Sequence, residues 1–208
     1  MAEDEGVTRP VIEPKQNRSR ATRERLLEAT VTSLAESGWA RTTVATVASR
    51  AGVSRGAAQH HFPTRTDLVT AAIEYMTEAR LEEIRSSSPE LPAGPGRVRA
   101  ALGHIVALYT GQLFTAALVV WAEAAVDAEL RERVIPLERR IGRESFALAL
   151  GLLDVDGTDP QVREVVAGAL DLARGLALAD VLTDDARRRG RVLDAWAVQL
   201  RQALERRE

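Results

Sequence analysis

Two very short helical segments joined by a glycine turn constrain the fold of this chain more than any other feature. Apolar spacing predicts one helix over 44–50 and a second over 54–60. Both are too short to be helices of an ordinary bundle. Gly52 lies between them and adopts a left-handed backbone conformation at little cost, which lets the two helices cross at a steep angle.

Residues that cap helices lie where these segments begin. Thr42 or Thr43 can cap the first segment, and Ser54 can cap the second. Thr64, followed three residues later by Asp67, forms a capping box that starts a longer helix. The apolar positions between these caps have the spacing of a helix-turn-helix core, and Phe62-Pro63 ends it: Val44, Val47, Ala48, Val53, Ala58 and Phe62.

The remainder of the chain also has helical periodicity. Ala and Leu dominate, apolar positions recur at spacings of three and four, and Asn-Gly and Asp-Gly hairpin signals are absent. We therefore expect an all-α chain of about nine helices. A Ser, Pro and Gly-rich connector spans 86–96. The seven other helices are expected at about 20–37, 65–86, 97–110, 112–126, 127–153, 160–182 and 189–207.

This map divides the chain into three parts. Residues 1–18 are expected to be a disordered arm, 19–66 a helix-turn-helix domain, and 67–208 a second helical domain. Charge follows the division, because residues 14–66 carry a net charge of +6 in a chain whose total is −2. Such asymmetry suggests that the first domain meets a polyanion. The alternative is a solvated basic face without a partner.

Composition excludes several classes of protein. The chain has no Cys and three His, and it contains no paired-carboxylate, Ser-His-Asp or glycine-rich phosphate constellation. We expect neither an enzyme nor a bound metal or cofactor. The first residues are acidic, unlike a secretory signal, and the longest apolar stretch, 113–122, is about half of the ~20 residues that span a bilayer. A cytoplasmic protein that inserts into no membrane is therefore expected.

The second short helix presents a face suited to DNA. With Ala58 and Phe62 turned inward, Gly56, Gln59 and His60 point outward. Gln can bond bidentately to adenine and Arg to guanine in the major groove, while helix starts and basic side chains hold phosphates. Double-stranded DNA is the expected partner, and the expected contact residues are Thr43, Ser54, Arg55, Gly56, Gln59, His60, His61 and Arg65.

The adjacent pair His60 and His61 has other interpretations. Two neighbouring histidines cannot share one helix face, so they make a poor metal site. We expect at least one of them to contact phosphate or a base. A packed, structural His61 is the alternative.

The stretch Gly38 to Gly56 (GWARTTVATVASRAGVSRG), continued by His60 to Leu68 (HHFPTRTDL), resembles the DNA-binding domain of the TetR family of transcriptional regulators. The resemblance covers about Arg20 to Leu68. In that family the position of Gln59 is usually a phosphate-contacting Tyr, and that of Arg65 is usually Lys. The resemblance implies a dimeric regulator, usually a repressor, that binds a near-palindromic operator and is released by a small-molecule effector.

Two apolar stripes near the C-terminus are candidates for the dimer interface, with an ordinary intramolecular core as the alternative. The resemblance also places a ligand cavity among the central helices, although most of its candidates can equally be core or surface. The interface candidates are Val162, Val166, Ala169, Ala173, Leu176, Leu193, Trp196 and Leu200, and the cavity candidates are His104, Leu108, Gln112, Phe114, Trp121, Phe146 and Arg174.

A second hypothesis comes from another class. A helical small-molecule carrier or scaffold could keep this fold and lose sequence-specific DNA binding, and Gln59 and the small Ala57 favour that reading slightly. Neither hypothesis identifies the effector, the operator or the target genes.

Overall fold

The structure is a computed structural model that describes residues 15–87, 90–183 and 185–205 of the 208-residue chain. These residues form nine helices and no strands, so the expected all-α fold is confirmed. The helices are α1 (Lys15–Arg41), α2 (Val44–Arg50), α3 (Arg55–His61), α4 (Arg65–Ser87), α5 (Gly96–Ala107), α6 (Gly111–Ala124), α7 (Ala128–Leu153), α8 (Pro160–Asp180) and α9 (Ala186–Glu205).

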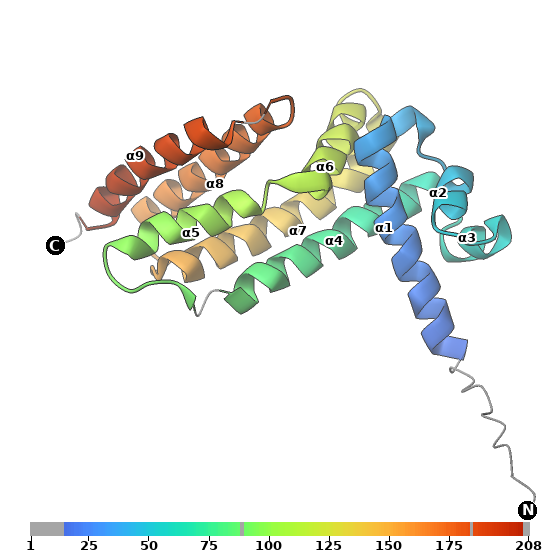
Figure 1. Ribbon diagram of the computed structural model, residues 1–208, viewed down its shortest axis with the longest axis horizontal. Coiled ribbons are helices and arrows are strands. Elements are labelled where there is room, and N and C mark those ends of the chain that lie inside the picture. Colours follow the sequence, from blue (N-terminus) through green and yellow to red (C-terminus); the bar gives the residue numbers. More distant parts are fainter. Residues whose placement is uncertain (1–14, 88–89, 184, 206–208) are drawn as a thin grey trace, which may run out of the picture.

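The molecule is elongated, with its two shortest helices at one end. Figure 1 shows α2 and α3 beside α1 at that end, and α8 and α9 over the other. Helices α4 and α7 run along the length of the molecule and pack against each other. Helix α4 therefore begins at the α2–α3 end and reaches the middle of the larger domain.

Helix α1 begins earlier than the sequence suggested. Residues 15–18 are helical, which corrects the expected disordered arm over that stretch, while residues 1–14 lie outside the described part of the chain. Extending an existing helix by one turn costs far less than nucleating it. The expected stop at Gly38 is a kink: its φ of 75° and ψ of 179° lie in a region essentially restricted to glycine, and the helix resumes as far as Arg41.

The core of the α1–α3 region continues into the larger domain. Buried Leu26 and Leu34 of α1 and Val47 of α2 belong to the same apolar cluster as Val120 of α6 and Val134 of α7. Removing this apolar surface from water stabilises both regions together. The helix-turn-helix unit is thus anchored on α4, α6 and α7, while the expected boundary at residue 66 stays a prediction.

The apolar stripes of α8 and α9 face the interior of the same chain. They pack on α5 and α7 in a second apolar cluster. Seven of the eight expected interface side chains are at most 5% exposed there, which corrects their assignment to a dimer interface: Val162, Val166, Ala169, Ala173, Leu176, Leu193 and Leu200. Periodicity reveals that a face is buried, and here helices of the same chain bury it. Trp196, the eighth, is partly buried against the same cluster.

Among the described residues, no single helix combines the length and apolar composition of a membrane span. Helices α5 and α6 reach that composition only when taken together, across a bend of 57°.

Candidate nucleic-acid interface and interior pocket

Local hydrogen bonds fix the geometry of α2 and α3. Thr43 Oγ1 accepts from the Thr46 amide at 3.1 Å, and Thr46 Oγ1 accepts from the Thr43 amide at 2.8 Å, which is a reciprocal capping box at the start of α2. Gly52 has a φ of 63°, and Ser54 Oγ accepts from the Ala57 amide at 3.2 Å at the start of α3. Both expected caps and the glycine turn are therefore present.

Helix α3 buries one side and exposes the other. Ala58 is 1% exposed and Phe62, directly after the helix, is 4% exposed. The side chains on the opposite face are in solvent, and a Cβ added at Gly56 would have no neighbour within 4 Å. The exposed set is Ser54, Arg55, Gly56, Gln59 and His60. This face has the size and the polar groups that a DNA groove accepts, with room for close approach at Gly56.

His61 differs from its neighbour His60, because it is partly buried. Its ring lies 5.9 Å from that of His60 and 6.3 Å from that of Phe62. Burial lowers the pKa of His61, and the nearby His60 and Arg23 lower it further. The imidazole is therefore largely neutral at pH 7, which favours a packing role over a charged phosphate contact.

Arg65 is engaged within the protein. Its guanidinium lies 3.7 Å from the centre of the Trp39 ring, and Nη2 donates to the Trp39 carbonyl at 2.6 Å. Partial burial lowers the pKa of Arg65, but not enough to discharge a guanidinium. The side chain joins the start of α4 to the end of α1, so the structure adds a positioning role to the expected phosphate contact, which stays a prediction.

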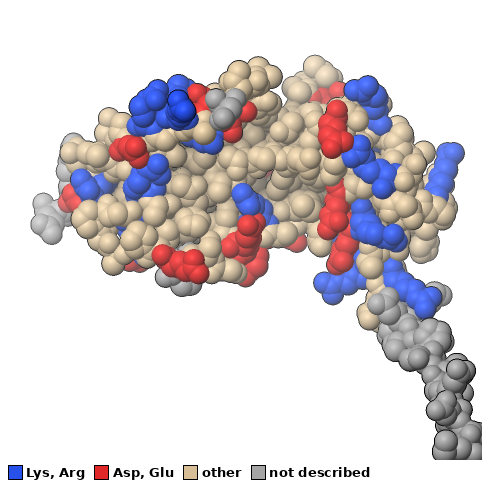
Figure 2. Space-filling view, in the orientation of Figure 1, with Lys and Arg blue, Asp and Glu red and all other residues tan. Residues whose placement is uncertain are grey.

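Basic side chains surround this end of the molecule. Figure 2 shows them over α1–α3, with acidic groups beside them, and a second group over the α8–α9 end. Some of the positive charge is neutralised locally, because Arg50 pairs with Glu36 at 2.7 Å. The guanidinium of Arg23 lies 5.6 Å from the Phe62 ring centre. The positive charge near α3 therefore comes mainly from exposed arginines such as Arg55.

The larger domain contains a pocket that is partly open to solvent. Its lining is mainly apolar with a few polar side chains, which is typical of sites for small organic molecules. Helices α4, α6 and α7 supply most of the lining, α8 adds Arg174, and the turn after α5 adds Leu108 and Tyr109. The lining residues are Thr70, Ile73, Thr77, Arg80, Leu108, Tyr109, Leu113, Phe114, Ala117, Val120, Trp121, Val134, Leu137, Glu138, Ile141, Ser145 and Arg174.

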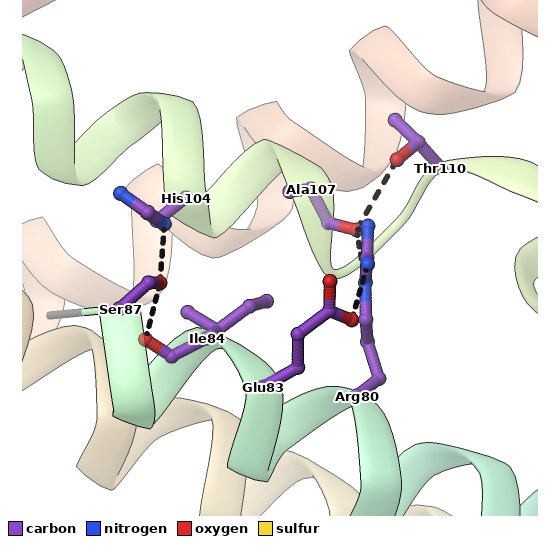
Figure 3. Close-up of polar contacts among 7 residues, drawn as sticks. All are labelled: Arg80, Glu83, Ile84, Ser87, His104, Ala107 and Thr110. Atoms are coloured by element: carbon purple, nitrogen blue, oxygen red, sulfur yellow. Dashed lines mark hydrogen bonds and ion pairs between the residues drawn. The ribbon is translucent and has the colours of Figure 1, made fainter.

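Four of the seven cavity candidates line this pocket: Leu108, Phe114, Trp121 and Arg174. The other three do not, and their assignment is corrected. His104 faces Ser87 at the end of α4, with Nδ1 3.5 Å from Oγ (Figure 3). Gln112 is exposed in the first turn of α6, and Phe146 lies under the guanidinium of Arg163. Each is on the expected helix, but on a face turned away from the pocket.

Arg80 ties the pocket wall of α4 to the end of α5. Its Nη2 and Nε donate to the carbonyl of Ala107 at 3.0 and 3.2 Å, and its Nη1 pairs with Glu83 at 2.7 Å (Figure 3). A cation at the C-terminus of a helix meets the negative end of the helix dipole. These contacts hold the Arg80 side chain in a fixed position in the pocket lining.

The polar groups of the pocket meet around Arg174. Its Nη2 lies 3.4 Å from the Tyr109 hydroxyl and 3.9 Å from Glu138 Oε1, and Nη1 pairs with Asp171 at 3.1 Å. Burial raises the pKa of Glu138, and Arg174 opposes that rise. Burial also raises the pKa of Tyr109, which keeps the phenol neutral. The rest of the lining is largely apolar, so the polar groups of the pocket are concentrated in this cluster.

Sequence reasoning missed the α4 and α7 walls. Thr70, Ile73 and Thr77 recur at helical spacing on α4, as do Leu137, Glu138 and Ile141 on α7. That spacing was visible in the sequence, and each set predicts a shared face. Nothing in the sequence indicated that the two faces meet, because that depends on how the helices pack.

With the geometry established, three comparisons place the chain among known proteins. Residues 26–72 match the family model of bacterial regulatory proteins, tetR family. The HTH-type transcriptional regulator CymR of Pseudomonas putida is 29% identical over 187 residues, which is 88% of this chain and 91% of that protein. An uncharacterized HTH-type transcriptional regulator of Mycobacterium bovis is 31% identical over 118 residues, 57% of this chain and 60% of that protein.

The fold has solved counterparts. A transcriptional regulator from Rhodococcus sp. Rha1 superposes with a TM-score of 0.64 at 25% identity, covering 88% of this chain and 96% of that one. The likeness therefore extends beyond the helix-turn-helix unit to the larger helical domain.

Proposed function

We propose that this chain, which belongs to the TetR family of transcriptional regulators, is a repressor that binds a near-palindromic operator as a homodimer and releases it when a small molecule enters the pocket. The observation that carries the proposal is the division of α3 between a buried side and an exposed polar side. A repressor of this kind acts on chromosomal DNA in the cytoplasm.

In this proposal α3 enters the major groove and Gln59 reads a base. Gln pairs bidentately with adenine, and such contacts discriminate between bases by about 1–3 kcal/mol. Gly56 lets the helix backbone approach the DNA closely. Thr43 and Ser54, at two helix starts, and the exposed Arg55 and His60 hold the phosphates on either side.

A second copy packs on the outer faces of α8 and α9. The exposed large apolar side chains of the C-terminal region lie on α8, directly after it and on α9: Leu178, Val181, Leu182 and Val198. Gly168 and Gly175 lie on the exposed side of α8, where an added Cβ would meet nothing within 4 Å, so a partner helix can approach closely. A second copy adds a second recognition helix, which matches the twofold symmetry of a palindromic operator.

The pocket can influence DNA binding because α4 belongs to both regions. Arg65, in its first turn, contacts Trp39, and Thr70, five residues later, lines the pocket. An effector shifts the equilibrium only if it binds the two conformations with different affinity. A coupling of about 1–3 kcal/mol changes operator affinity roughly 5- to 150-fold.

The proposal is tested by the affinity of the purified chain for short duplexes from neighbouring promoters, measured by fluorescence anisotropy at several salt concentrations. We expect an inverted repeat to bind at least about a thousandfold tighter than a scrambled duplex, with affinity falling steeply as salt rises. Equal, weak binding to both duplexes would contradict the proposal and favour a small-molecule carrier that has lost sequence-specific DNA binding.

A further inference from the structure

Arg174 and Glu138 form a long ion pair in the pocket. Arg174 Nη2 and Glu138 Oε1 are 3.9 Å apart, beyond hydrogen-bond distance. The Nε of Arg174 is buried and has no hydrogen-bond partner among the described residues. Glu138 makes no shorter contact with a basic side chain in the described part of the chain. Both residues line the pocket, and each keeps hydrogen-bonding capacity that the ion pair does not use.

Aromatic rings already surround the guanidinium. It lies 5.0 Å from the centre of the Tyr109 ring and 6.0 Å from that of Trp121. Phe114 packs edge-on against both rings, at 5.8 and 6.5 Å. Arg174 therefore occupies the position over the rings that a cationic ligand would otherwise take.

Charge further narrows the ligand class. A cation near Glu138 would lie beside Arg174, and an anion near Arg174 would lie beside Glu138, so either meets a like charge in a partly buried site. A neutral hydroxyl accepts a hydrogen bond from Arg174 and donates one to Glu138. Its oxygen can lie about 2.8 Å from both atoms while they stay 3.9 Å apart.

We propose that the pocket takes a neutral, mainly apolar aromatic molecule whose hydroxyl group bridges Arg174 and Glu138. The ring contacts the apolar lining from α6 and α7, and the hydroxyl completes the hydrogen bonds that the ion pair lacks. This inference rests on the proposed function, because it names the chemical class of the effector for the same pocket.

Four probes with one ring system separate the ligand classes: 2-naphthol, 2-naphthoate, 2-naphthylmethylammonium and 2-methylnaphthalene. Their binding to the full chain is measured by isothermal titration calorimetry at pH 7. We expect 2-naphthol to bind roughly tenfold or more tightly than each of the others, because it alone both accepts from Arg174 and donates to Glu138 without adding charge.

The variant Glu138→Leu tests the bridge. It should reduce 2-naphthol binding to the level of 2-methylnaphthalene, while 2-methylnaphthalene binds as well as it does to the parent chain, which also shows that the pocket is intact. Glu132→Leu, at an exposed position on the same helix, is the matched control and should change neither affinity. The inference is overturned if a charged probe binds most tightly, if all four bind equally, if none binds, or if Glu138→Leu keeps the preference for 2-naphthol.

Operator binding is measured separately in the presence of each probe. If 2-naphthol binds with the expected preference but leaves operator affinity unchanged, the ligand class stands and effector-controlled release fails. If a charged probe binds most tightly and releases the operator, the regulatory proposal stands and the hydroxyl inference fails.

Discussion

The α2–α3 unit and the interior pocket are the two candidate functional regions of this molecule, and they are built in opposite ways. The α2–α3 unit is fixed by caps and a glycine turn within about twenty consecutive residues, Thr43 to Phe62. The pocket combines side chains from Thr70 to Arg174, on four helices and the turn after α5. Contacts between neighbouring residues are enough to shape the exposed face of α3, whereas the shape of the pocket depends on how distant helices pack.

The two regions also differ in how well their polar groups are satisfied. The hydroxyls of Thr43 and Ser54 cap helices at normal hydrogen-bond distances. In the pocket, Glu138 and Arg174 are partly buried and only loosely paired. Leaving buried polar groups without partners costs stability, so such an arrangement is expected where a ligand supplies the missing partner. Substitutions that act on one region more than the other sharpen this comparison.

The largest effect is expected for Phe62→Ala. The ring is 4% exposed in the core shared by the helix-turn-helix unit and α6, so its removal leaves a cavity that costs about 3–5 kcal/mol. Urea unfolding measures the loss, and operator binding should fall with it. A loss below about 1 kcal/mol would show that this end of the core is not packed as described.

Arg65→Met is expected to cost about 1–2 kcal/mol of stability, because it removes the contact with the Trp39 ring and the bond to its carbonyl. Operator and scrambled duplexes should lose affinity equally. The salt dependence decides the mechanism: an unchanged slope of log affinity against log salt indicates a positioning residue, and a slope reduced by about one indicates a phosphate contact.

Gly52→Ala is expected to cost about 1 kcal/mol. Its φ of 63° is a left-handed conformation that a Cβ disfavours, and the added methyl group would meet no atom within 4 Å, so the cost is one of backbone strain. Gly142→Ala, at a helical glycine of α7 whose added Cβ also meets nothing within 4 Å, is the control and should not destabilise the chain. If thermal unfolding shows that the Gly52→Ala variant is as stable as the parent chain, the turn at Gly52 is not strained for other residues.

The smallest effect, about 0.5–1 kcal/mol at neutral pH, is expected for Asp67→Asn. The Thr64 hydroxyl donates to Asp67 at 2.7 Å and Arg133 donates at 2.5 Å, and the Thr64 bond contributes most to the lowered pKa of the carboxyl. Because the pKa of Asp67 is lower in the folded state than in the unfolded state, the ionised carboxylate stabilises the fold above about pH 3.9. This stabilisation is lost as the pH falls and the carboxylate is protonated. The stability difference between parent and variant should therefore shrink in acid, and a constant difference would contradict this origin.

Features set by neighbouring residues were predictable from the sequence. The bounds of α2 were predicted to the residue, and the caps at Thr43 and Ser54 were also anticipated, because each depends on contacts within one or two turns. Gly38 was expected to end α1 and instead kinks it. A glycine permits either outcome, so the residue type alone does not choose between them.

Features set by packing between distant segments were not predictable. The stripe on α8 correctly indicated an apolar face, but its pairing with α5 was invisible in the sequence, so Val166 and Ala169 were assigned to the wrong surface. Similarly, His104 was placed in the pocket, and the structure turns it toward Ser87. Helical periodicity gives the direction of a side chain relative to its own helix and carries no information about which neighbour it meets.

If the exposed face of α3 reads the DNA sequence, replacing Gln59 by Ala must weaken the discrimination between sequences. The measurement is the ratio of affinities for the operator and a scrambled duplex, with Gln112→Ala, at an exposed position in α6, as the control. We expect Gln59→Ala to lower this ratio about tenfold or more without changing stability, and Gln112→Ala to leave it unchanged. An unchanged ratio for Gln59→Ala, or an equal loss in both variants, would contradict sequence reading by α3.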